Sequence, residues 1–448
     1  MAPDDWHDLT VRSGREFSSA RQEVLKKTLA ELQFPMDVAA AWPQFQSVNL
    51  QHDLERDADH TSFYQHKALA WVSSWVLPLL IGLLTAATGT LIEIGSEFLN
   101  RWRYSYPDLW NCTQEQCQWL SWSAGEETSL DWQGFGAYVL VSVALATLSA
   151  VLVKQFAPSA RGSGIPEVKT ILGGFVMKDT LSASTLIVKV IGLMLSVSSG
   201  LALGKEGPTV HIACCWANVT RAFSGRYSNE GRFRELLSVA SAAGVSVAFG
   251  APVGGVLFSY EEVSTRFPRS TMIRAFFAAV VAALALSWYD ALGTGKLTLF
   301  EVNYPQEPVL AEYLLFLLLG CIGGVVGAAF VHLNMKVSEL RKDGTPFRTR
   351  VPIVLEVALI ALATAITSYP SEYTRGLSNL TIHSLFHRCD GDSQVNPLTL
   401  CDGDKDSTEA TLVLTLLMAA MIRFAQVTVT FGTGVPCGLF VPSLYVGA

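Results

Sequence analysis

Long apolar stretches recur along the chain and are separated by short polar segments. Several of them reach the length of about 20 residues that a membrane-crossing helix needs, while others are shorter or are interrupted by Gly and Pro. Irregular backbone at membrane depth is tolerated only where it is buried in protein or lines a cavity. The pattern therefore predicts an all-α polytopic membrane protein with broken helices. The stretches are Ala68–Ile94, Phe135–Val153, Leu186–Leu203, Leu236–Phe258, Ala275–Trp288, Tyr313–Val331, Ile353–Ala365 and Thr411–Met421.

The composition supports this prediction. Half of the 448 residues are hydrophobic and only 16% are charged, and the mean hydropathy is +0.33. Such a chain is too apolar for an ordinary soluble domain. A large soluble helical core would not need so many long apolar runs. The net charge of −7 argues against a nucleic-acid partner.

The polar segments between these stretches divide into two kinds by charge. Lys336–Arg350 and Arg221–Arg234 are basic, which is typical of cytosolic loops, whereas Asn100–Trp132 and Ser368–Glu409 are acidic. No signal peptide precedes the first apolar stretch, and basic residues are scattered through the segment before it. We therefore expect residues 1–66 to form a cytosolic N-terminal region.

Each acidic loop holds two cysteines and an N-glycosylation sequon, and this combination places both loops in the lumen. An oxidising lumen allows the two cysteines of a loop to pair, and the sequence leaves open whether they do. The remaining cysteines lie in apolar surroundings without metal-site spacing, so we predict packing roles and no metal site. The candidate disulfides join Cys112 to Cys117 and Cys389 to Cys401, and the candidate glycosylated residues are Asn111 and Asn379.

The most informative residue is Glu206, which stands between two apolar stretches. A carboxylate at membrane depth is costly and usually faces a pore, a partner or a proton path. Its neighbours Gly204, Lys205, Gly207 and Pro208 describe a break between helices, because glycines let backbone approach a small ligand and proline suits a first helical turn. The segment therefore indicates an anion-sized site with an acid placed where the anion would lie, which suggests transport.

Two further segments have the same Gly and Pro pattern at the start of a helix. The Ser163 hydroxyl of the first can donate to an anion, as can the backbone N–H groups of Leu439 and Phe440 in the second. Helix N-termini that converge can hold chloride without a full positive charge. The alternative is three unrelated loop-to-helix turns, since Gly and Pro commonly occur at the ends of helices. The segments are Gly162, Ser163, Gly164, Ile165 and Pro166, and Gly438, Leu439, Phe440, Val441 and Pro442.

Two adjacent carboxylates, Glu261 and Glu262, follow an apolar run. They fit either a solvated pair at the membrane interface or the mouth of a proton path. Because helix ends often carry charge, the residues alone favour the solvated pair.

The three glycine-containing segments resemble the anion-site motifs of the CLC family of chloride channels and chloride/proton exchangers. The segments 162–172, 204–208 and 241–258, together with Cys214 and Cys215, are similar to the eukaryotic intracellular exchanger branch. The resemblance implies the CLC fold, with two inverted-topology halves and an ion site between broken helices.

The resemblance also implies roles for individual residues. Ser163 would coordinate a central chloride together with the amides of Leu439 and Phe440. Glu206 would be the gating glutamate, whose carboxylate competes with chloride. Glu262 would be the internal proton-transfer glutamate of exchangers, at a position where channels of the family have an apolar residue. This implication reverses the preference for a solvated pair at Glu262.

The resemblance thus implies voltage-dependent exchange of chloride for protons across an endosomal, Golgi or vacuolar membrane by a homodimer. Chloride and protons would be the substrates, and neither a cofactor nor an enzymatic activity is expected. The alternatives are a passive voltage-gated chloride channel and a truncated chain that does not transport. An intramembrane enzyme is disfavoured, because the sequence has no His-Glu-x-x-His zinc motif and no phosphate-binding loop.

The chain ends at Ala448, just inside the helix that the third motif opens. In the family, further membrane helices follow, including a tyrosine that completes the chloride site, and eukaryotic members also have paired CBS domains. We therefore expect residues 67–448 to be a CLC transmembrane domain that is incomplete at its C-terminus and lacks CBS domains.

Overall fold

The computed structural model describes residues 46–47, 65–107, 119–121, 132–177, 179–222, 227, 229–289, 309–342, 344–376, 378–386 and 409–448. These residues are mostly helical. The first α-helices are α4 (Gln65–Tyr104), α5 (Trp132–Phe156), α6 (Ile165–Leu172), α7 (Ala183–Ser198), α8 (Glu206–Arg221), α9 (Glu230–Phe249), α10 (Pro252–Phe258) and α11 (Arg269–Tyr289). They are followed by α12 (Leu310–Leu340), α13 (Pro346–Arg350), α14 (Ile353–Ser368), α15 (Glu372–Arg375), α16 (Ser378–Phe386), α17 (Glu409–Thr430) and α18 (Phe440–Gly447).

Contacts divide the chain into two units, each of which is described by itself. The smaller unit comprises residues 1–48 and 175–177. Its described part is a short antiparallel pair of strands, β1 (Gln46–Ser47) and β4 (Phe175–Val176). The larger unit contains the helices and a second antiparallel pair, β2 (Ser105–Pro107) and β3 (Trp119–Ser121). The division at residue 67 stays a prediction, because the structure describes only residues 46, 47, 65 and 66 of the predicted N-terminal region.

The predicted apolar stretches are helical, and within the described residues five helices are long and apolar enough to cross a membrane. Two shorter apolar helices, α7 and α14, lie among them. The predicted all-α polytopic architecture with helices of uneven length is therefore confirmed. The five long spans are Ser74–Tyr104, Gly134–Phe156, Arg269–Tyr289, Glu312–Leu340 and Thr411–Thr430.

Two of the predicted stretches are interrupted, and in both the interruption contains a glycine with positive φ. Gly200, with φ 77°, follows the end of α7, and Gly250, with φ 66°, separates α9 from α10. Both conformations lie in the left-handed region that L-residues other than glycine rarely adopt. A π-helix, η3 (Ser259–Val263), continues α10 and carries the two adjacent glutamates. Single π-turns of this kind are frequent at functional sites.

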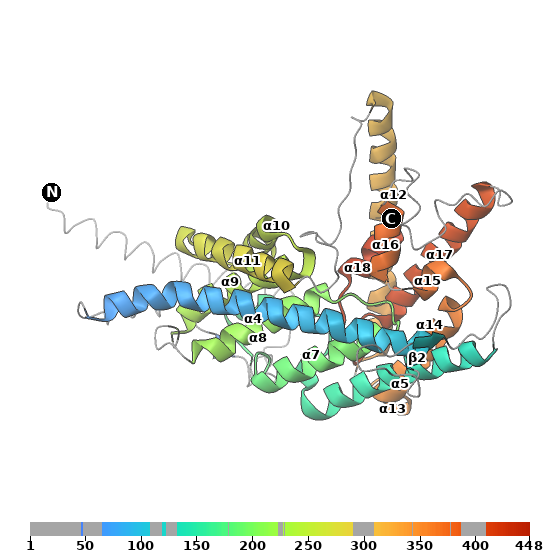
Figure 1. The fold of residues 1–448 in the computed structure, drawn as a ribbon, viewed down its shortest axis with the longest axis horizontal. Helices are drawn as coiled ribbons and strands as arrows, with labels where there is room; N and C mark the ends of the chain where they lie inside the picture. The colour runs from blue at the N-terminus through green and yellow to red at the C-terminus, as the bar shows by residue number, and fades with distance from the viewer. Residues whose placement is uncertain are drawn as a thin grey trace, which may run out of the picture. The chain divides into compact units, whose positions relative to one another are not determined.

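Small residues allow the helices of the larger unit to pack closely. In the view of Figure 1, α4 has α9 and α11 on one side and α7 and α8 on the other, and it contacts all four. A Cβ atom added to Gly82 of α4 would lie 2.8 Å from the carbonyl oxygen of Ala278 on α11. The buried face of α11 is built mainly from alanines, including Ala278 and Ala282. This packing surrounds α8, which begins at Glu206.

Candidate functional site

Backbone hydrogen bonds join the three glycine-containing segments that the sequence predicts to converge. The N–H of Gly204 donates to the carbonyl oxygen of Gly438, and the N–H of Gly438 donates to that of Gly204, both at 2.8 Å. The N–H of Gly162 donates to the Val435 carbonyl oxygen at 3.1 Å, and the Cys437 N–H donates to that of Gly162 at 3.3 Å. Gly438 and the residues 435–437 that lead into it therefore connect the third segment to the other two, although the three are far apart in the sequence.

Glycines stand where these segments cross. A Cβ atom on Gly207 would lie 2.8 Å from Cβ of Ser163, and one on Gly438 would lie 2.9 Å from the carbonyl oxygen of Gly204. Real Cβ atoms do not approach neighbours so closely, so a larger residue at either position would push the segments apart. The glycines therefore let the segments approach one another, and the predicted approach of backbone to a small ligand stays a prediction.

Three helices begin at the crossing. α6 begins at Ile165, α8 at Glu206 and α18 at Phe440, and in each the residue before the helix makes no side-chain capping hydrogen bond. The Ile165 N–H instead meets the Ser163 hydroxyl oxygen at 3.4 Å. First-turn N–H groups have no partner within their own helix and carry the positive end of the helix dipole. This arrangement offers several donors to a small anion.

Glu206 lies at this crossing and is almost completely buried, with 3% of its surface exposed. Neither carboxyl oxygen makes a hydrogen bond within the described part of the chain, although the backbone N–H groups of Lys205, Glu206 and Val441 lie close by. A Cβ atom on Gly204 would lie 2.2 Å from Glu206 Oε2, so this glycine makes room for the carboxyl group. A buried acid without hydrogen bonds is unusual and calls for a functional explanation.

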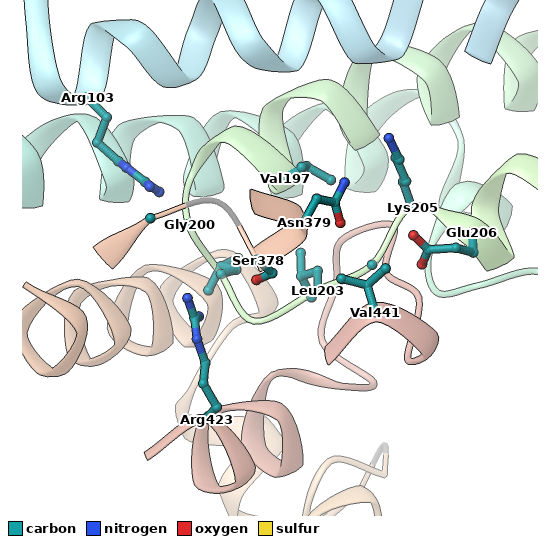
Figure 2. A pocket seen from close by; sticks show the side chains of 13 residues that line it. Arg103, Val197, Gly200, Leu203, Lys205, Glu206, Ser378, Asn379, Arg423 and Val441 are labelled. Atoms are coloured by element: carbon teal, nitrogen blue, oxygen red, sulfur yellow. The ribbon is translucent and has the colours of Figure 1, made fainter. Parts of the chain in front are cut away.

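A cavity of about 40 Å³ opens beside Glu206. Figure 2 shows the carboxyl group of Glu206 near Val441, and the guanidinium groups of Arg103 and Arg423 entering from α4 and α17. The cavity is lined by Arg103, Val197, Gly200, Leu201, Leu203, Gly204, Lys205, Glu206, Gly376, Ser378, Asn379, Arg423 and Val441. The predicted carboxylate therefore faces a space that also holds basic residues.

Glu261 and Glu262 lie on η3, and both are exposed. The Glu262 carboxylate pairs with the ammonium group of Lys169 on α6, with Oε2 and Nζ 3.5 Å apart. Both side chains are more than half exposed, so this ion pair contributes little stability. It does connect η3 to α6, the helix that begins after Ser163.

Several predicted residues fall outside the described part of the chain, namely Asn111, Cys112, Cys117, Cys389 and Cys401. Asn379 is described: it lies on α16, is half-buried and lines the cavity. Cys214, Cys215 and Cys437 are buried, as the predicted packing role requires, whereas Cys321 on α12 is exposed, so the prediction is wrong for this residue. Among the residues with described positions, no group of His, Cys, Asp and Glu is arranged to hold a metal ion.

The sequence analysis missed a buried pair behind the Ser163 segment. The Lys189 ammonium group donates to His211 Nδ1 at 2.8 Å, and His211 Nε2 donates to the Thr180 carbonyl oxygen at 3.0 Å. Both side chains are fully buried. A Cβ atom on Gly164 would lie 2.2 Å from the His211 ring. The sequence does contain a signal for Lys189, because a charged residue inside an apolar stretch is as costly as the carboxylate of Glu206.

Arg103 and Arg423 were missed as well. Arg423 lies inside an apolar span, so the rule that selected Glu206 also selects it. Arg103 stands at the end of α4 next to an acidic loop, where a basic residue usually faces water. Its burial arises from contacts with segments distant in the sequence, which no local pattern reveals.

A family model described as voltage gated chloride channel matches residues 145–448. The chain belongs to this family. Membership in the CLC family confirms the resemblance based on the motifs, and it agrees with the expectation of a transporter rather than an enzyme.

Two curated CLC relatives are named as exchangers. The chain is 38% identical over 470 residues to the H(+)/Cl(-) exchange transporter 5 of Cavia porcellus, covering 93% of this chain and 62% of the relative. It is 40% identical over 419 residues to the H(+)/Cl(-) exchange transporter 3 of Homo sapiens, covering 85% of this chain and 50% of the relative. The chain thus spans about half to three fifths of the length of these relatives.

Solved structures confirm the CLC fold. A crystal structure of a eukaryotic CLC transporter aligns with a TM-score of 0.62 at 24% identity, covering 84% of this chain and 58% of that one. An X-ray structure of a slow cyanobacterial Cl-/H+ antiporter also aligns with a TM-score of 0.62, at 22% identity, covering 82% of this chain and 76% of that one.

Proposed function

We propose that this chain contains the ion-exchange pathway of a transporter that moves chloride and protons in opposite directions across an intracellular membrane. One observation carries the proposal: three helix N-termini meet around Glu206, a buried carboxyl group that makes no hydrogen bond to the residues whose positions are described. The similarity to relatives named H(+)/Cl(-) exchange transporters supports it. The same relatives support an intracellular membrane as the location.

Chloride would bind at the crossing of the three segments. The Ser163 hydroxyl and the amides of Leu439 and Phe440 are the donors, supported by the dipoles of α6 and α18. Amides and hydroxyls bind chloride without fixing a full positive charge beside it. Binding is then weak enough for the ion to leave, as fast passage requires.

Glu206 would connect the movement of chloride to that of protons. A charged carboxylate at this position competes with chloride for the same N–H donors and repels the ion. Protonation removes that charge, so the side chain can leave the path and chloride can enter. Each such event carries a proton, and this is the physical origin of coupling.

Glu262 would supply the proton from the cytosolic side. Its exposed position on η3 lets it exchange protons with water. The ion pair with Lys169 holds Glu262 next to α6, the helix that follows the Ser163 segment. Charges that move across the membrane field make the exchange voltage-dependent. We expect the transporter to be a homodimer.

Liposome reconstitution of the chain, with chloride and pH recorded together, tests the proposal. An outward chloride gradient should drive protons inward against their own gradient. Glu262→Ala should abolish proton movement and retain chloride flux. Glu261→Ala is the matched control, because this exposed neighbour has the same chemistry and should retain both.

Each other outcome contradicts a different part of the proposal. Chloride flux without proton movement in the unaltered chain would indicate a passive channel. Absence of both fluxes in well-folded protein would indicate a chain that does not transport. Proton movement that survives Glu262→Ala would remove Glu262 from the pathway.

A further inference from the structure

Two side chains, from α12 and from the residue that follows it, hold the end of α17. Arg341 Nη1 donates to the Phe431 carbonyl oxygen at 2.7 Å, and its Nη2 donates to that of Val429. Asn334 Nδ2 donates to the carbonyl oxygens of Thr428 at 2.9 Å and of Phe431 at 3.3 Å. The last carbonyl groups of a helix have no partner within that helix, and a positive charge beside them is favourable. These contacts therefore fix the point at which the chain leaves α17.

A carboxylate fixes the orientation of Arg341. Its Nε donates to Glu356 Oε1 of α14, and Arg348 Nη1 lies 3.0 Å from Glu356 Oε2. Arg341 is 9% exposed and Glu356 is 4% exposed, so this ion pair is largely removed from water. The planar guanidinium group presents five N–H donors, which lets it meet one carboxylate and two carbonyl oxygens at once. Lysine has a charge of the same sign but no such fork.

The chain that leaves α17 leads directly to the crossing. We call residues 431–438 the linking segment, and its first turn contains Gly432, whose φ is 85°. Further along it, Val435 and Cys437 are completely buried in an apolar cluster that includes Val357 of α14. α14 therefore supports the linking segment directly, in addition to holding Arg341.

The linking segment has little room to move. The Ser196 hydroxyl of α7 donates to the Pro436 carbonyl oxygen at 3.0 Å. A Cβ atom on Gly434 would lie 2.2 Å from Cγ2 of Ile353 on α14. At the far end, the reciprocal backbone hydrogen bonds of Gly438 join the segment to the break before α8. Close-packed interiors transmit displacements, so a shift at the start of the segment reaches the start of α18.

We propose that Arg341 is a positioning residue for chloride, because it sets where the linking segment starts and thereby where the amides of Leu439 and Phe440 lie. Arg341 is not itself a ligand of the anion and acts through the backbone of Phe431. The inference rests on the proposed function for the position of the chloride ion. Arg341 belongs to the basic segment predicted to be cytosolic, so the donors of the anion site are anchored from that segment.

The chain contains a matched control for this role. Arg348 shares the Glu356 carboxylate with Arg341, and its Nε donates to the Arg341 carbonyl oxygen at 3.2 Å. Arg341→Gln and Arg348→Gln therefore each deprive Glu356 of one of its two arginines. Only Arg341→Gln also releases the carbonyl groups of Val429 and Phe431. The two variants thus separate the ion pair from the anchor.

Calorimetric titration of the full chain measures chloride affinity, and thermal unfolding in detergent measures stability. Arg341→Lys keeps the charge beside Glu356 and loses the fork, so it should bind chloride roughly tenfold more weakly with a small change in the unfolding midpoint. Arg341→Gln should weaken binding at least as much and should also lower the midpoint. Arg348→Gln should lower the midpoint similarly and keep normal chloride affinity. Arg341→Lys also covers the case in which Arg341→Gln fails to fold.

Asn334→Ala tests the same anchor without changing a charge. It removes the neutral donor to Thr428 and Phe431, so chloride affinity should fall by a smaller factor than in Arg341→Lys. Hydrogen exchange of the amides in residues 432–440, followed by mass spectrometry, reports on the linking segment itself. Exchange should be faster in Arg341→Lys and Asn334→Ala than in Arg348→Gln.

The outcomes separate this inference from the proposed function. Normal chloride affinity in Arg341→Lys overturns the positioning role and leaves the exchange pathway unaffected. Equal losses of affinity in Arg341→Gln and Arg348→Gln also overturn it, because affinity would then follow the stability of the ion pair. Weaker binding in Arg341→Lys, together with chloride flux that moves no protons in the unaltered chain, supports the positioning role and contradicts exchange. Absence of chloride binding in the unaltered chain overturns both.

Discussion

The ammonium group of Lys205 pairs with the carboxylate of Glu93, one helix away, and not with the adjacent Glu206. The lysine of the Gly204–Pro208 segment therefore balances a charge on α4. Glu206 is left without an ion-pair partner among the described residues. The gating role proposed for Glu206 requires this arrangement, since a direct bond to Lys205 would hold the carboxyl group charged and in place.

Glu93→Gln should therefore lower both stability and transport. The substitution leaves a partly buried ammonium group without its negative partner, which should cost about 2 kcal/mol. The freed Lys205 can then turn to Glu206 and hold the carboxyl group in its charged form. We expect a lower midpoint of thermal unfolding in detergent and slower chloride flux in liposomes.

The matched control for this prediction is Glu97→Gln on the same helix. Glu97 pairs with Arg101 at 3.0 Å, but both side chains are largely exposed, so the loss should be below about 1 kcal/mol. Equal effects of the two substitutions would show that the Lys205–Glu93 pair has no special role.

Glu206→Ala should uncouple the two ions. Without the carboxyl group, no proton is needed to open the chloride path, so chloride flux should continue and become independent of pH. Glu206→Gln should behave similarly, because the amide is neutral at every pH. Recording chloride flux between acidic and neutral pH checks this prediction. Flux that still follows pH would show that another group controls the path.

The local pattern of the sequence located the three segments, because their glycines and prolines interrupt apolar stretches, but it left three unrelated turns as an alternative. The backbone bonds between Gly204 and Gly438 could not be predicted from the same pattern, since each segment alone is an ordinary turn. The burial of Arg103 arises from partners at Ser198 and Arg375, distant in the sequence. Such contacts depend on the tertiary fold.

The two glutamates of η3 illustrate a different limit. Because helix ends often carry charge, the residues alone favoured a solvated pair. The structure places both side chains at the surface. The pairing of Glu262 with Lys169 distinguishes it from Glu261, but exposure alone is compatible with either role. The π-turn that presents these residues packs against α9, a contact between separate elements that the local sequence pattern does not show.

Gly438→Ala should weaken chloride binding more than it weakens the fold as a whole. The added Cβ atom would lie 2.9 Å from the Gly204 carbonyl oxygen, which is backbone and cannot rotate away. The reciprocal hydrogen bonds with Gly204 should lengthen, and the start of α18 should move from the start of α8. Chloride titration by calorimetry measures this effect.

Gly136→Ala on α5 provides the reference for Gly438→Ala. Nothing lies within 4 Å of a Cβ atom at Gly136, and alanine favours a helix over glycine by up to about 1 kcal/mol. This variant should therefore bind chloride normally and unfold at the same or a higher temperature. Normal chloride affinity in Gly438→Ala would contradict a role for the crossing in binding.

Gly164→Ala should be far more damaging than Gly162→Ala, although both glycines flank Ser163 and both have positive φ. Gly162 has φ 69° and open space around a Cβ position, so alanine there should cost only the backbone strain of about 1–2 kcal/mol. Gly164 has φ 82°, and its Cβ would lie 2.2 Å from the buried His211 ring. The ring is held by Lys189 and Thr180 and cannot easily move.

Adding His211→Ala to Gly164→Ala should recover part of this loss, because it removes the clash and leaves the strain. In a double-mutant cycle measured by thermal unfolding, the double variant should be about 1–3 kcal/mol more stable than the sum of the two single effects predicts. His211→Ala alone should be destabilising, since it deprives the buried Lys189 of its hydrogen-bond partner. Strictly additive effects would show that the ring does not fix the Ser163 segment, and that the Lys189–His211 pair serves the core and not the anion site.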